Sequence, residues 1–300
     1  MAALSDNTRG AVLMMTGMAA FTVNDTLMKL ILGDIPMFQA LFLRGIGTSL
    51  IFALIAWRMG ALHLGQFPVR DRWLIVVRTL AEAFAAFFFM AALSQMSLAN
   101  LTAILQALPL AITLGAALFL GEPVGWKRLA AIGVGFVGVM LIIRPGTDGF
   151  NVYSISALIS VGFVTLRDLV TRSMSSQVPS LLVAFAAAVG VMALAGVASL
   201  TEPWVMPKAL TIWYILAAKV FIVAGYLLSV MSVRVGDLGY VAPFRYTGLV
   251  WALLLGFLVF GDWPKAITLV GAAIVVATGL YTFARERRLR RAVATDAPMR

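Results

Sequence analysis

The amino-acid sequence predicts an all-α polytopic membrane protein with ten transmembrane helices, and three observations lead to that prediction. The 300 residues are 62% hydrophobic and only 12% charged, whereas a typical soluble domain is about 45–50% apolar and about 25% charged. Apolar stretches close to the roughly 20 residues that cross a bilayer recur along the whole chain. The connections between them are short and rich in turn residues, so they leave no room for a soluble domain.

Five spans are predicted in the first half of the chain. The first is interpreted as a retained span rather than a cleavable signal, because it is long and contains charged residues. The second begins directly after Pro36, and the third follows the basic segment 70–72. Gly-Glu-Pro at 121–123 closes the fourth, and Arg-Pro-Gly at 144–146 closes the fifth. The expected bounds are 10–32, 37–57, 73–93, 98–120 and 126–143.

Five further spans are predicted in the second half. The sixth is, with the fifth, the shortest apolar segment. Glu202-Pro203 ends the seventh, and a Gly-Asp-Trp-Pro turn at 261–264 ends the ninth. The tenth leads directly into a basic tail. The expected bounds are 152–169, 181–200, 210–233, 238–260 and 266–284.

The distribution of basic residues predicts that the N- and C-termini are both cytoplasmic. With that orientation most Lys and Arg residues, including Arg167 and the tail, lie on the cytoplasmic side, and only Arg144, Lys208 and Lys265 lie on the other. This excess is the positive-inside bias of membrane proteins, and it explains most of the net charge of +10. No nucleic-acid motif is visible, so the expected surroundings are the lipid bilayer, with anionic lipid as a further contact for the basic cluster 285–291.

A weak internal repeat divides the chain into two halves. Because each half contains five spans, an odd number, the second half must enter the membrane from the opposite side. The sequence thus predicts one five-helix repeat at 1–148, an inverted five-helix repeat at 149–286 and a basic cytoplasmic tail at 287–300. Shifts of 140 to 143 residues align Trp73, Leu98, Gly121, Asp25, Lys29 and Pro36 with Trp213, Leu238, Gly261, Asp168, Arg172 and Pro179.

Several motifs resemble the drug/metabolite transporter superfamily, in particular its ten-helix EamA-type bacterial branch. The fourth and ninth spans close with Leu-Phe-Leu-Gly-Glu-Pro (118–123) and Leu-Val-Phe-Gly-Asp-Trp-Pro (258–264). Val-Ala-Pro-Phe-Arg-Tyr-Thr-Gly-Leu-Val-Trp at 241–251 looks like the ninth helix of that branch. The opening Phe-Thr-Val-Asn-Asp-Thr-Leu-Met-Lys at 21–29 is similar to members that take up S-adenosylmethionine. The resemblance implies a carrier of the bacterial inner membrane that works by alternating access.

The composition excludes several kinds of site. The chain has no cysteine and one histidine, His63, so disulfides, thiolate metal sites and histidine-rich metal cages are excluded. A membrane enzyme would need a nucleophile–base pair or a metal cluster, and neither is visible. We therefore expect no enzymatic activity, no cofactor and no metal. His63 lies in the loop after the second span and is not expected to relay protons.

Two i,i+4 charge pairs lie inside predicted spans: Asp25 with Lys29, and Arg78 with Glu82. A charge at the bilayer centre costs at least about 2.5–3.5 kcal/mol on insertion scales, so such residues normally face a cavity or a partner. Residues at this spacing share a helix face and can neutralise each other. Each pair is either a structural tie between helices or part of a substrate or coupling-ion site.

The fourth span has a polar stripe. Thr102, Gln106, Pro109 and Thr113 follow one another at spacings that keep them on one helix face. A proline inside a span frees a backbone carbonyl, which is tolerated where protein or water can satisfy it. Pro109 is therefore expected to kink the fourth span and Pro243 the ninth. The threonines can be packing contacts between helices, whereas Gln106 is a candidate substrate contact.

Other candidate substrate-binding residues lie in the second, eighth and ninth spans. Buried positive charge exceeds negative charge, and unpaired cations in low dielectric are costly. A water-filled vestibule or an anionic substrate group would compensate for that excess. In this scheme Arg44 or Arg245 meets a carboxylate, Asp25 meets an amine, and aromatic rings stack on the substrate. The full set is Asp25, Arg44, Gln106, Lys219, Arg245, Tyr246 and Trp251.

The sequence therefore predicts a secondary transporter for a small polar metabolite that is zwitterionic or bears a carboxylate. S-adenosylmethionine, riboflavin and amino acids are candidate substrates, and protons are a candidate coupling ion through Asp25 or Glu82. The alternatives are an efflux carrier for aromatic or cationic drugs, a lipid-linked flippase and a passive channel. Saturable flux with counterflow distinguishes a carrier from a channel.

Overall fold

The computed structural model describes residues 5–60, 67–122, 124–146, 151–175 and 177–295, with backbone alone at 238, 239 and 286–295. His63, the boundary at 148/149 and the end of the basic tail lie outside the described residues. The helices are α1 (Asp6–Leu32), α2 (Met37–Arg58), α3 (Val69–Gln95), α4 (Leu98–Leu105), α5 (Leu108–Phe119), α6 (Trp126–Ile143), α7 (Tyr153–Arg172), α8 (Ser180–Ala198), η2 (Ser199–Thr201), α9 (Ala209–Val235), α10 (Leu238–Val241), η3 (Ala242–Tyr246), α11 (Thr247–Phe260) and α12 (Ala266–Thr295).

The all-helical fold and the ten predicted spans are confirmed. Within the described residues ten helical segments are long and apolar enough to cross a membrane, and no strand is present there. Their bounds differ from the sequence-based bounds by a few residues. Capping explains two of the starts, because the hydroxyls of Ser5 and Ser97 accept the backbone N–H of Thr8 and Asn100, which would otherwise lack a partner.

Two spans are interrupted in the middle. The fourth is divided into α4 and α5 at Gln106 and Ala107, and Pro109 is the second residue of α5. The ninth consists of α10, the 3-10 helix η3 and α11, and Pro243 lies in the first turn of η3. A proline cannot donate a backbone hydrogen bond, so an α-helix loses its regular ladder near it. The polar stripe expected on one continuous fourth helix is therefore spread over two helices.

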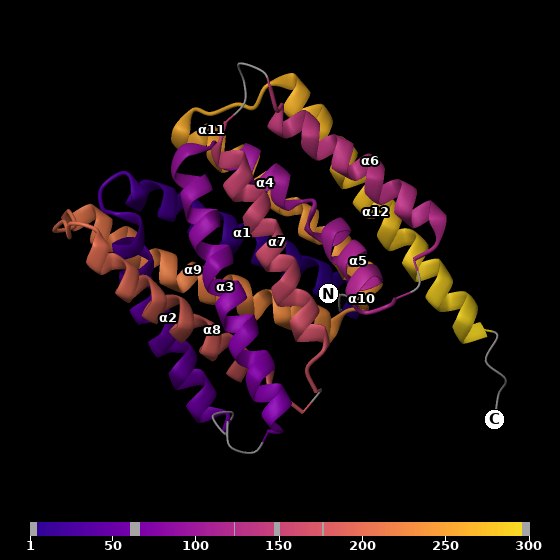
Figure 1. Cartoon of the computed structure of the whole chain (residues 1–300), viewed down its shortest axis with the longest axis horizontal. Helices are drawn as coiled ribbons and strands as arrows, with labels where there is room; N and C mark the ends of the chain where they lie inside the picture. Colours follow the sequence, from indigo (N-terminus) through magenta and orange to yellow (C-terminus); the bar gives the residue numbers. More distant parts are fainter. Residues whose placement is uncertain (1–4, 61–66, 123, 147–150, 176, 296–300) are drawn as a thin grey trace.

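The helices pack mainly across the two halves of the chain (Figure 1). The closest pairings join α1 with α9, α2 with α8, α3 with α7, and α6 with α12, so each pair takes one helix from either half. The α6–α12 pair runs along one edge of the molecule. The main apolar core is built from buried residues of both halves, among them Met28, Leu41, Leu101 and Val275. The halves thus form one packed body around shared contacts.

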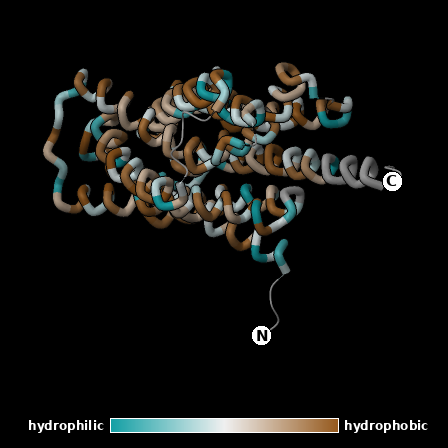
Figure 2. The backbone as a smooth tube through the Cα atoms, turned by 90° about the horizontal axis from the view of Figure 1, so that it is seen from below, coloured by the Kyte–Doolittle hydropathy of each residue, from teal (hydrophilic) through white to brown (hydrophobic). Residues whose placement is uncertain are grey.

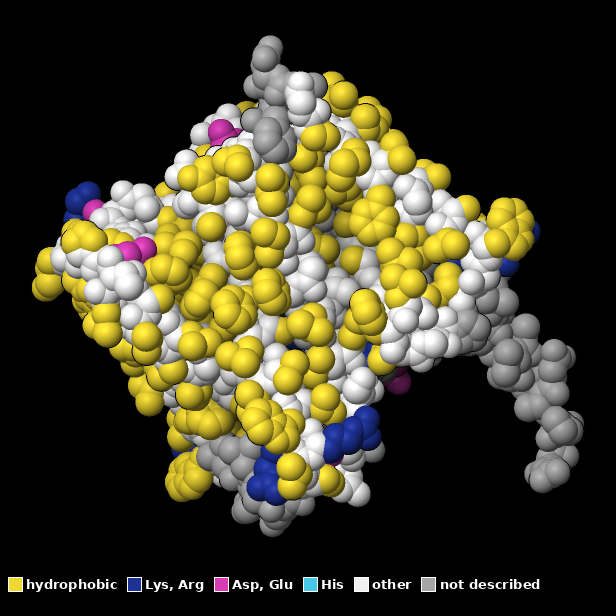
Figure 3. Space-filling view, in the orientation of Figure 1, with side chains coloured by type: hydrophobic (Ala, Val, Ile, Leu, Met, Phe, Trp, Pro, Cys, Tyr) yellow, Lys and Arg dark blue, Asp and Glu magenta, His cyan; other side chains and the backbone are white. Residues whose placement is uncertain are grey.

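The outer surface is apolar. Large side chains such as Trp73, Phe119 and Leu200 are exposed, and Figure 2 shows hydrophobic residues along most of the helices. In Figure 3 hydrophobic side chains cover most of the visible face, and Lys and Arg gather at its lower edge, where α3 begins and α7 ends. Such a surface would aggregate in water, whereas hydrocarbon chains are its favourable environment.

Polar contacts connect the loop after α1 to the segment before α9. Asp34 accepts from the ammonium of Lys208 at 2.8 Å and from the hydroxyl of Thr211 at 2.6 Å. Gln39 and Val205 exchange two hydrogen bonds of 2.7 and 3.0 Å through the Gln39 amide and the Val205 backbone. We call these five residues the loop latch. The hydrogen bonds from Lys208 and Thr211 lower the pKa of Asp34 to about 2.

Candidate functional site

A four-residue charge network joins α3 to α7 inside the helix bundle. The Arg167 guanidinium lies 3.2 Å from a Glu82 oxygen and 2.8 Å from Asp168, and Arg78 reaches Glu82 at 3.5 Å. These side chains are only 10–27% exposed. Arg78 is fixed further by Thr171 Oγ1 at 3.3 Å. Because every charge has an opposite partner, the network can persist inside the bundle.

The expected Arg78–Glu82 pair is thus formed, but it belongs to a larger group than the sequence indicated. Arg167 was assigned to the cytoplasmic loops, and Asp168 was expected to cancel it near the edge of the membrane. Both lie instead within α7, and Arg167 bridges Asp168 to Glu82 on α3. The two halves of the chain therefore meet through ionic contacts as well as through apolar packing.

Arg245 of η3 stands next to this network without being bound into it. Its side chain is exposed, and it has no hydrogen bond or ion pair with any residue that the structure describes. It nevertheless interacts electrostatically with Asp168 and Arg167 of α7. A solvent-accessible guanidinium within range of charges on another helix is available to bind an anionic group.

Asp25 belongs to a second polar group between α1 and α2. The Asn24 amide donates to Asp25 Oδ1 at 2.9 Å, and Arg44 Nη1 donates to Asn24 Oδ1 at 3.3 Å. Asn24 and Arg44 are buried. Arg44 also interacts electrostatically with Asp25 and Glu82, so the two polar groups lie within range of each other. We call Asp25, Arg44, Arg78, Glu82, Arg167, Asp168 and Arg245 together the central charge cluster.

The expected Asp25–Lys29 pair is not formed. The Lys29 ammonium donates to the backbone carbonyls of Leu93, at 3.1 Å, and of Met96, and it lies 5.5 Å from the centre of the Phe260 ring. These carbonyls end α3, where a helix leaves acceptors without intrahelical donors. A cation at that position is also favoured by the helix dipole. Lys29 therefore ties α1 to the end of α3, and Asp25 is left to Asn24 and Arg44.

The two helix interruptions touch each other. The Gln106 amide donates to the backbone carbonyl of Tyr246 at 3.1 Å, so the break in the fourth span is fastened to the break in the ninth. The Tyr246 side chain does not make the expected substrate contact, because it points toward α12. There it packs against Phe283, and a side chain at position 279 would collide with its hydroxyl, which explains Gly279.

The remaining two candidates lie apart from the central charge cluster. Lys219 of α9 packs against Gly47 of α2, where a Cβ atom would collide with the lysine chain. It has no ion pair among the described residues. Trp251 of α11 is partly buried, and its indole N–H has no hydrogen-bond partner there. The structure thus groups Asp25, Arg44 and Arg245 and leaves Lys219 and Trp251 outside that group.

Sequence analysis missed the roles of Arg167, Asp168 and Asn24. The available signal was the repeat itself, which aligns Asp168 with Asp25 at a shift of 143 residues. An acidic residue at equivalent depth in each half suggests two related positions in one site. In the described residues no group of His, Asp and Glu side chains has the arrangement of a metal site. The chemistry available here is recognition of charged groups.

Comparison with known proteins identifies the family. Residues 8–144 match the EamA-like transporter family. These residues belong to that family. The resemblance to EamA-type members of the drug/metabolite transporter superfamily is therefore confirmed, and the family indicates a transporter rather than an enzyme. The chain is a multi-pass integral membrane protein, and in bacteria such a protein lies in the inner membrane.

Individual relatives extend the similarity to most of the chain. A riboflavin transporter of Rhizobium johnstonii is 28% identical over 78% of this chain and 82% of its own length. An S-adenosylmethionine uptake transporter of Rickettsia prowazekii is 23% identical over 95% of this chain and 96% of its own. One solved structure superposes with a TM-score of 0.64 over 93% of this chain and 98% of the other, at 21% identity, which shows a common fold.

Proposed function

We propose that this EamA-type protein is a secondary transporter that moves a small zwitterionic or carboxylate-bearing metabolite across the bacterial inner membrane by alternating access. The observation that supports this most directly is Arg245. It is exposed and has no ionic partner in the described chain, yet it lies within electrostatic range of Asp168 and Arg167. A cation in this position, at the interruption of a membrane helix, is suited to receive a substrate anion.

The inverted repeat is part of this proposal, and three structural parallels support it. Gly121 and Gly261, which are 140 residues apart, end their spans with φ of 67° and 68°, a left-handed conformation that favours glycine. The breaks at Gln106 and η3 occur at the same shift. The pairing of α1 with α9 matches that of α7 with α3 when the halves are exchanged. Odd-numbered halves related in this way cross the membrane in opposite directions.

The charges of the cluster favour a substrate with an anionic group. Once Lys29 and Lys219 are assigned elsewhere, the cluster contains the arginines 44, 78, 167 and 245 and the carboxylates 25, 82 and 168, so one cation is in excess. A carboxylate balances it, and a zwitterion can also use Asp25, which has no ion pair in the described chain. Gln106 and Trp251 remain proposed as uncharged contacts. Protons are the proposed coupling ion, and Asp25 and Glu82 are their candidate carriers.

The relatives suggest which substrates to test first. Proteins similar to this chain are named for riboflavin and S-adenosylmethionine, and amino acids fit the same charge pattern. The alternative function is efflux of aromatic or cationic drugs or of lipid-linked compounds. The excess cation disfavours cationic drugs, because it would repel them.

The loop latch suggests which side of the site is closed. Under the proposed topology the loop after α1 and the segment before α9 are periplasmic. Asp34, Gln39 and Thr211 bind them together. We therefore propose that this conformation is closed toward the periplasm and that the central charge cluster is reached from the cytoplasm. The latch would have to open for the opposite state to form.

Transport by purified protein in liposomes tests the proposed function. Labelled riboflavin, S-adenosylmethionine and amino acids are offered with and without a proton gradient, and unlabelled substrate is tested for counterflow. We expect saturable uptake of at least one compound with a negatively charged group. Arg245→Gln should reduce it about 100-fold, because a lost charge-assisted contact costs about 2–3 kcal/mol. Arg58→Gln removes the same charge at an exposed helix end and should transport normally. Normal transport by folded Arg245→Gln would contradict the proposal.

A further inference from the structure

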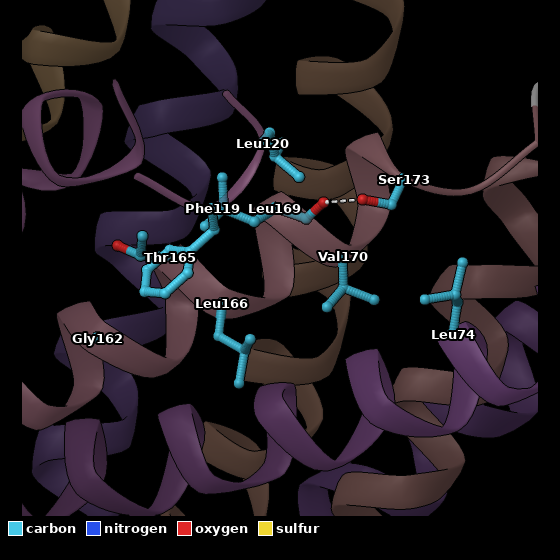
Figure 4. Close-up of a pocket in the computed structure, with 9 residues that line it drawn as sticks. All are labelled: Leu74, Phe119, Leu120, Gly162, Thr165, Leu166, Leu169, Val170 and Ser173. Carbon is cyan, nitrogen blue, oxygen red and sulfur yellow. Dashed lines mark hydrogen bonds between the residues drawn. The ribbon is translucent and has the colours of Figure 1, made fainter. Parts of the chain in front are cut away.

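The largest described cavity lies away from the central charge cluster, on the outer side of α7. It has a volume of about 440 Å³ and lies where α3 begins and α5 and α7 end. Figure 4 shows that its lining comes from these three helices. Leu74, Phe119, Leu166, Leu169 and Val170 form most of its wall. We call it the α3–α5–α7 chamber.

The chamber is apolar and has no free polar group in its described wall. Its two hydroxyls are already used inside α7: Thr165 Oγ1 donates to the carbonyl of Val161 at 2.8 Å, and Ser173 Oγ donates to that of Leu169 at 3.1 Å. The second of these bonds is drawn in Figure 4. A polar metabolite would leave its own groups without partners here. A hydrocarbon chain meets the requirement.

The chamber faces the surrounding membrane. Phe119 and Leu166 of its wall are 79% and 42% exposed, and neighbouring residues of α3 such as Val76 and Val77 are exposed as well. These residues lie on the hydrocarbon-facing surface of the bundle. An acyl chain can therefore enter from the side without crossing a polar barrier, and it gains free energy from each buried methylene.

Basic side chains stand at the rim of the chamber. Arg70 donates to the carbonyl of Ser173, a lining residue, at 3.4 Å. Arg172, next in sequence to Ser173, pairs with Glu122 at 3.1 Å, and both side chains are half-exposed. Arg72 is exposed on the first turn of α3. Three guanidinium groups against one carboxylate leave a positive rim, and Figure 3 shows basic side chains gathered at this edge. Such a rim complements a lipid phosphate.

We propose that the α3–α5–α7 chamber binds one anionic phospholipid, with an acyl chain in the apolar interior and its phosphate at Arg70, Arg72 and Arg172. This site is separate from transport and does not depend on the proposed substrate. One turn of α7 separates the two: Leu166 and Leu169 line the chamber, whereas Arg167 and Asp168 belong to the charge network on the other side. A bound lipid thus supports the helix that carries the network.

Gly162 offers a way to fill the chamber without disturbing the protein. It lines the chamber from α7, and no atom lies within 4 Å of a Cβ built at this position. Gly162→Phe should therefore place its ring in the chamber at no steric cost to the protein. Gly133 of α6 is a matched control, because it is also helical and has equally open space, but it does not line the chamber.

The experiment uses the full chain purified in detergent and titrated with phosphatidylglycerol or phosphatidylcholine, with bound lipid measured by native mass spectrometry. We expect wild type and Gly133→Phe to retain one phosphatidylglycerol more strongly than phosphatidylcholine. Gly162→Phe should retain about tenfold less, because it excludes several methylenes. Arg70→Gln with Arg172→Gln should abolish the preference between the two lipids while leaving chain binding.

Three results would overturn the proposal. The first is equal retention by wild type and Gly162→Phe, which would mean that the lipid is not in the chamber. The second is equal loss in Gly162→Phe and Gly133→Phe. The third is equal retention of both lipids by wild type, which would show that the basic rim selects nothing. Folding of each variant is checked by its thermal unfolding, and transport is not needed as a readout.

Discussion

At the scale of single residues, the central charge cluster contains arginines in two different situations. Arg167 lies between Glu82 and Asp168, with contacts of 3.2 and 2.8 Å. Arg245 has no ionic contact in the described chain and is exposed. The first arginine compensates charges that the fold has taken out of water, and the second does not. Removing one or the other should therefore have opposite consequences for stability and transport.

We expect Arg167→Met to destabilise the protein far more than Arg245→Gln. Loss of Arg167 leaves two carboxylates without their main partner, which costs about 3–5 kcal/mol when they are fully buried. Because Glu82 and Asp168 are 26% and 27% exposed, about 2 kcal/mol is the expected cost. Arg245→Gln should change stability by less than about 0.5 kcal/mol. Thermal unfolding in detergent measures both, and similar losses would contradict the assignment.

At this scale the sequence predicted residue types better than partners. Asp25, Arg44 and Arg245 were found because a charge inside an apolar span is unusual. The Asp25–Lys29 pair was wrong because helix spacing indicates only which side chains can meet, and the open carbonyls at the end of α3 compete for the lysine. Tyr246 was misassigned because a position in a helix does not reveal which neighbour the ring faces. Those details depend on tertiary packing.

At the scale of helices and loops, the loop latch connects two segments that are far apart in the chain. The Lys208 ammonium and the Thr211 hydroxyl hold the Asp34 carboxylate in its charged form and lower its pKa from 3.8 to about 2. A group with a lowered folded-state pKa stabilises the fold above its ordinary pKa. That contribution is lost as pH falls through the folded value. The latch should therefore be fully formed at neutral pH and fail only in strong acid.

Asp34→Asn tests this expectation. The variant should lose stability at neutral pH and should show a smaller further loss than wild type between pH 3.8 and about 2, because its amide does not titrate. Thermal unfolding across that range measures both effects. Asp6→Asn, at a mostly exposed carboxylate near the N-terminus, is the control and should follow wild type. An identical acid profile for Asp34→Asn and wild type would exclude the latch as the source.

The helices themselves were well predicted, since all ten follow from apolar segments and turn residues. The interruptions were only half predicted. Pro109 and Pro243 indicated where the fourth and ninth spans weaken, but not that the breaks would be fastened together by Gln106 and the Tyr246 carbonyl. That contact joins residues 140 apart in the chain, and single-sequence patterns contain no information on such distant pairs.

At the scale of the whole molecule, the two halves contribute to one packed body. Each of the closest helix pairings takes a member from either half, and the charge network spans the same boundary through α3 and α7. A transporter of this design changes access by moving one half against the other around a fixed site. The account therefore depends on a water-accessible, charged crevice between oppositely oriented halves.

Labelling of single cysteines tests that claim most directly, because the natural chain has none. Cysteines at positions 25 and 245 are exposed to a membrane-impermeant thiol reagent in right-side-out and inside-out vesicles, with Arg58→Cys as a cytoplasmic reference. We expect both positions to react from the cytoplasmic side, and to react from the periplasmic side only when Asp34→Asn opens the latch. If neither position reacts from either side while position 58 does, the crevice does not exist and the proposed transport route is wrong.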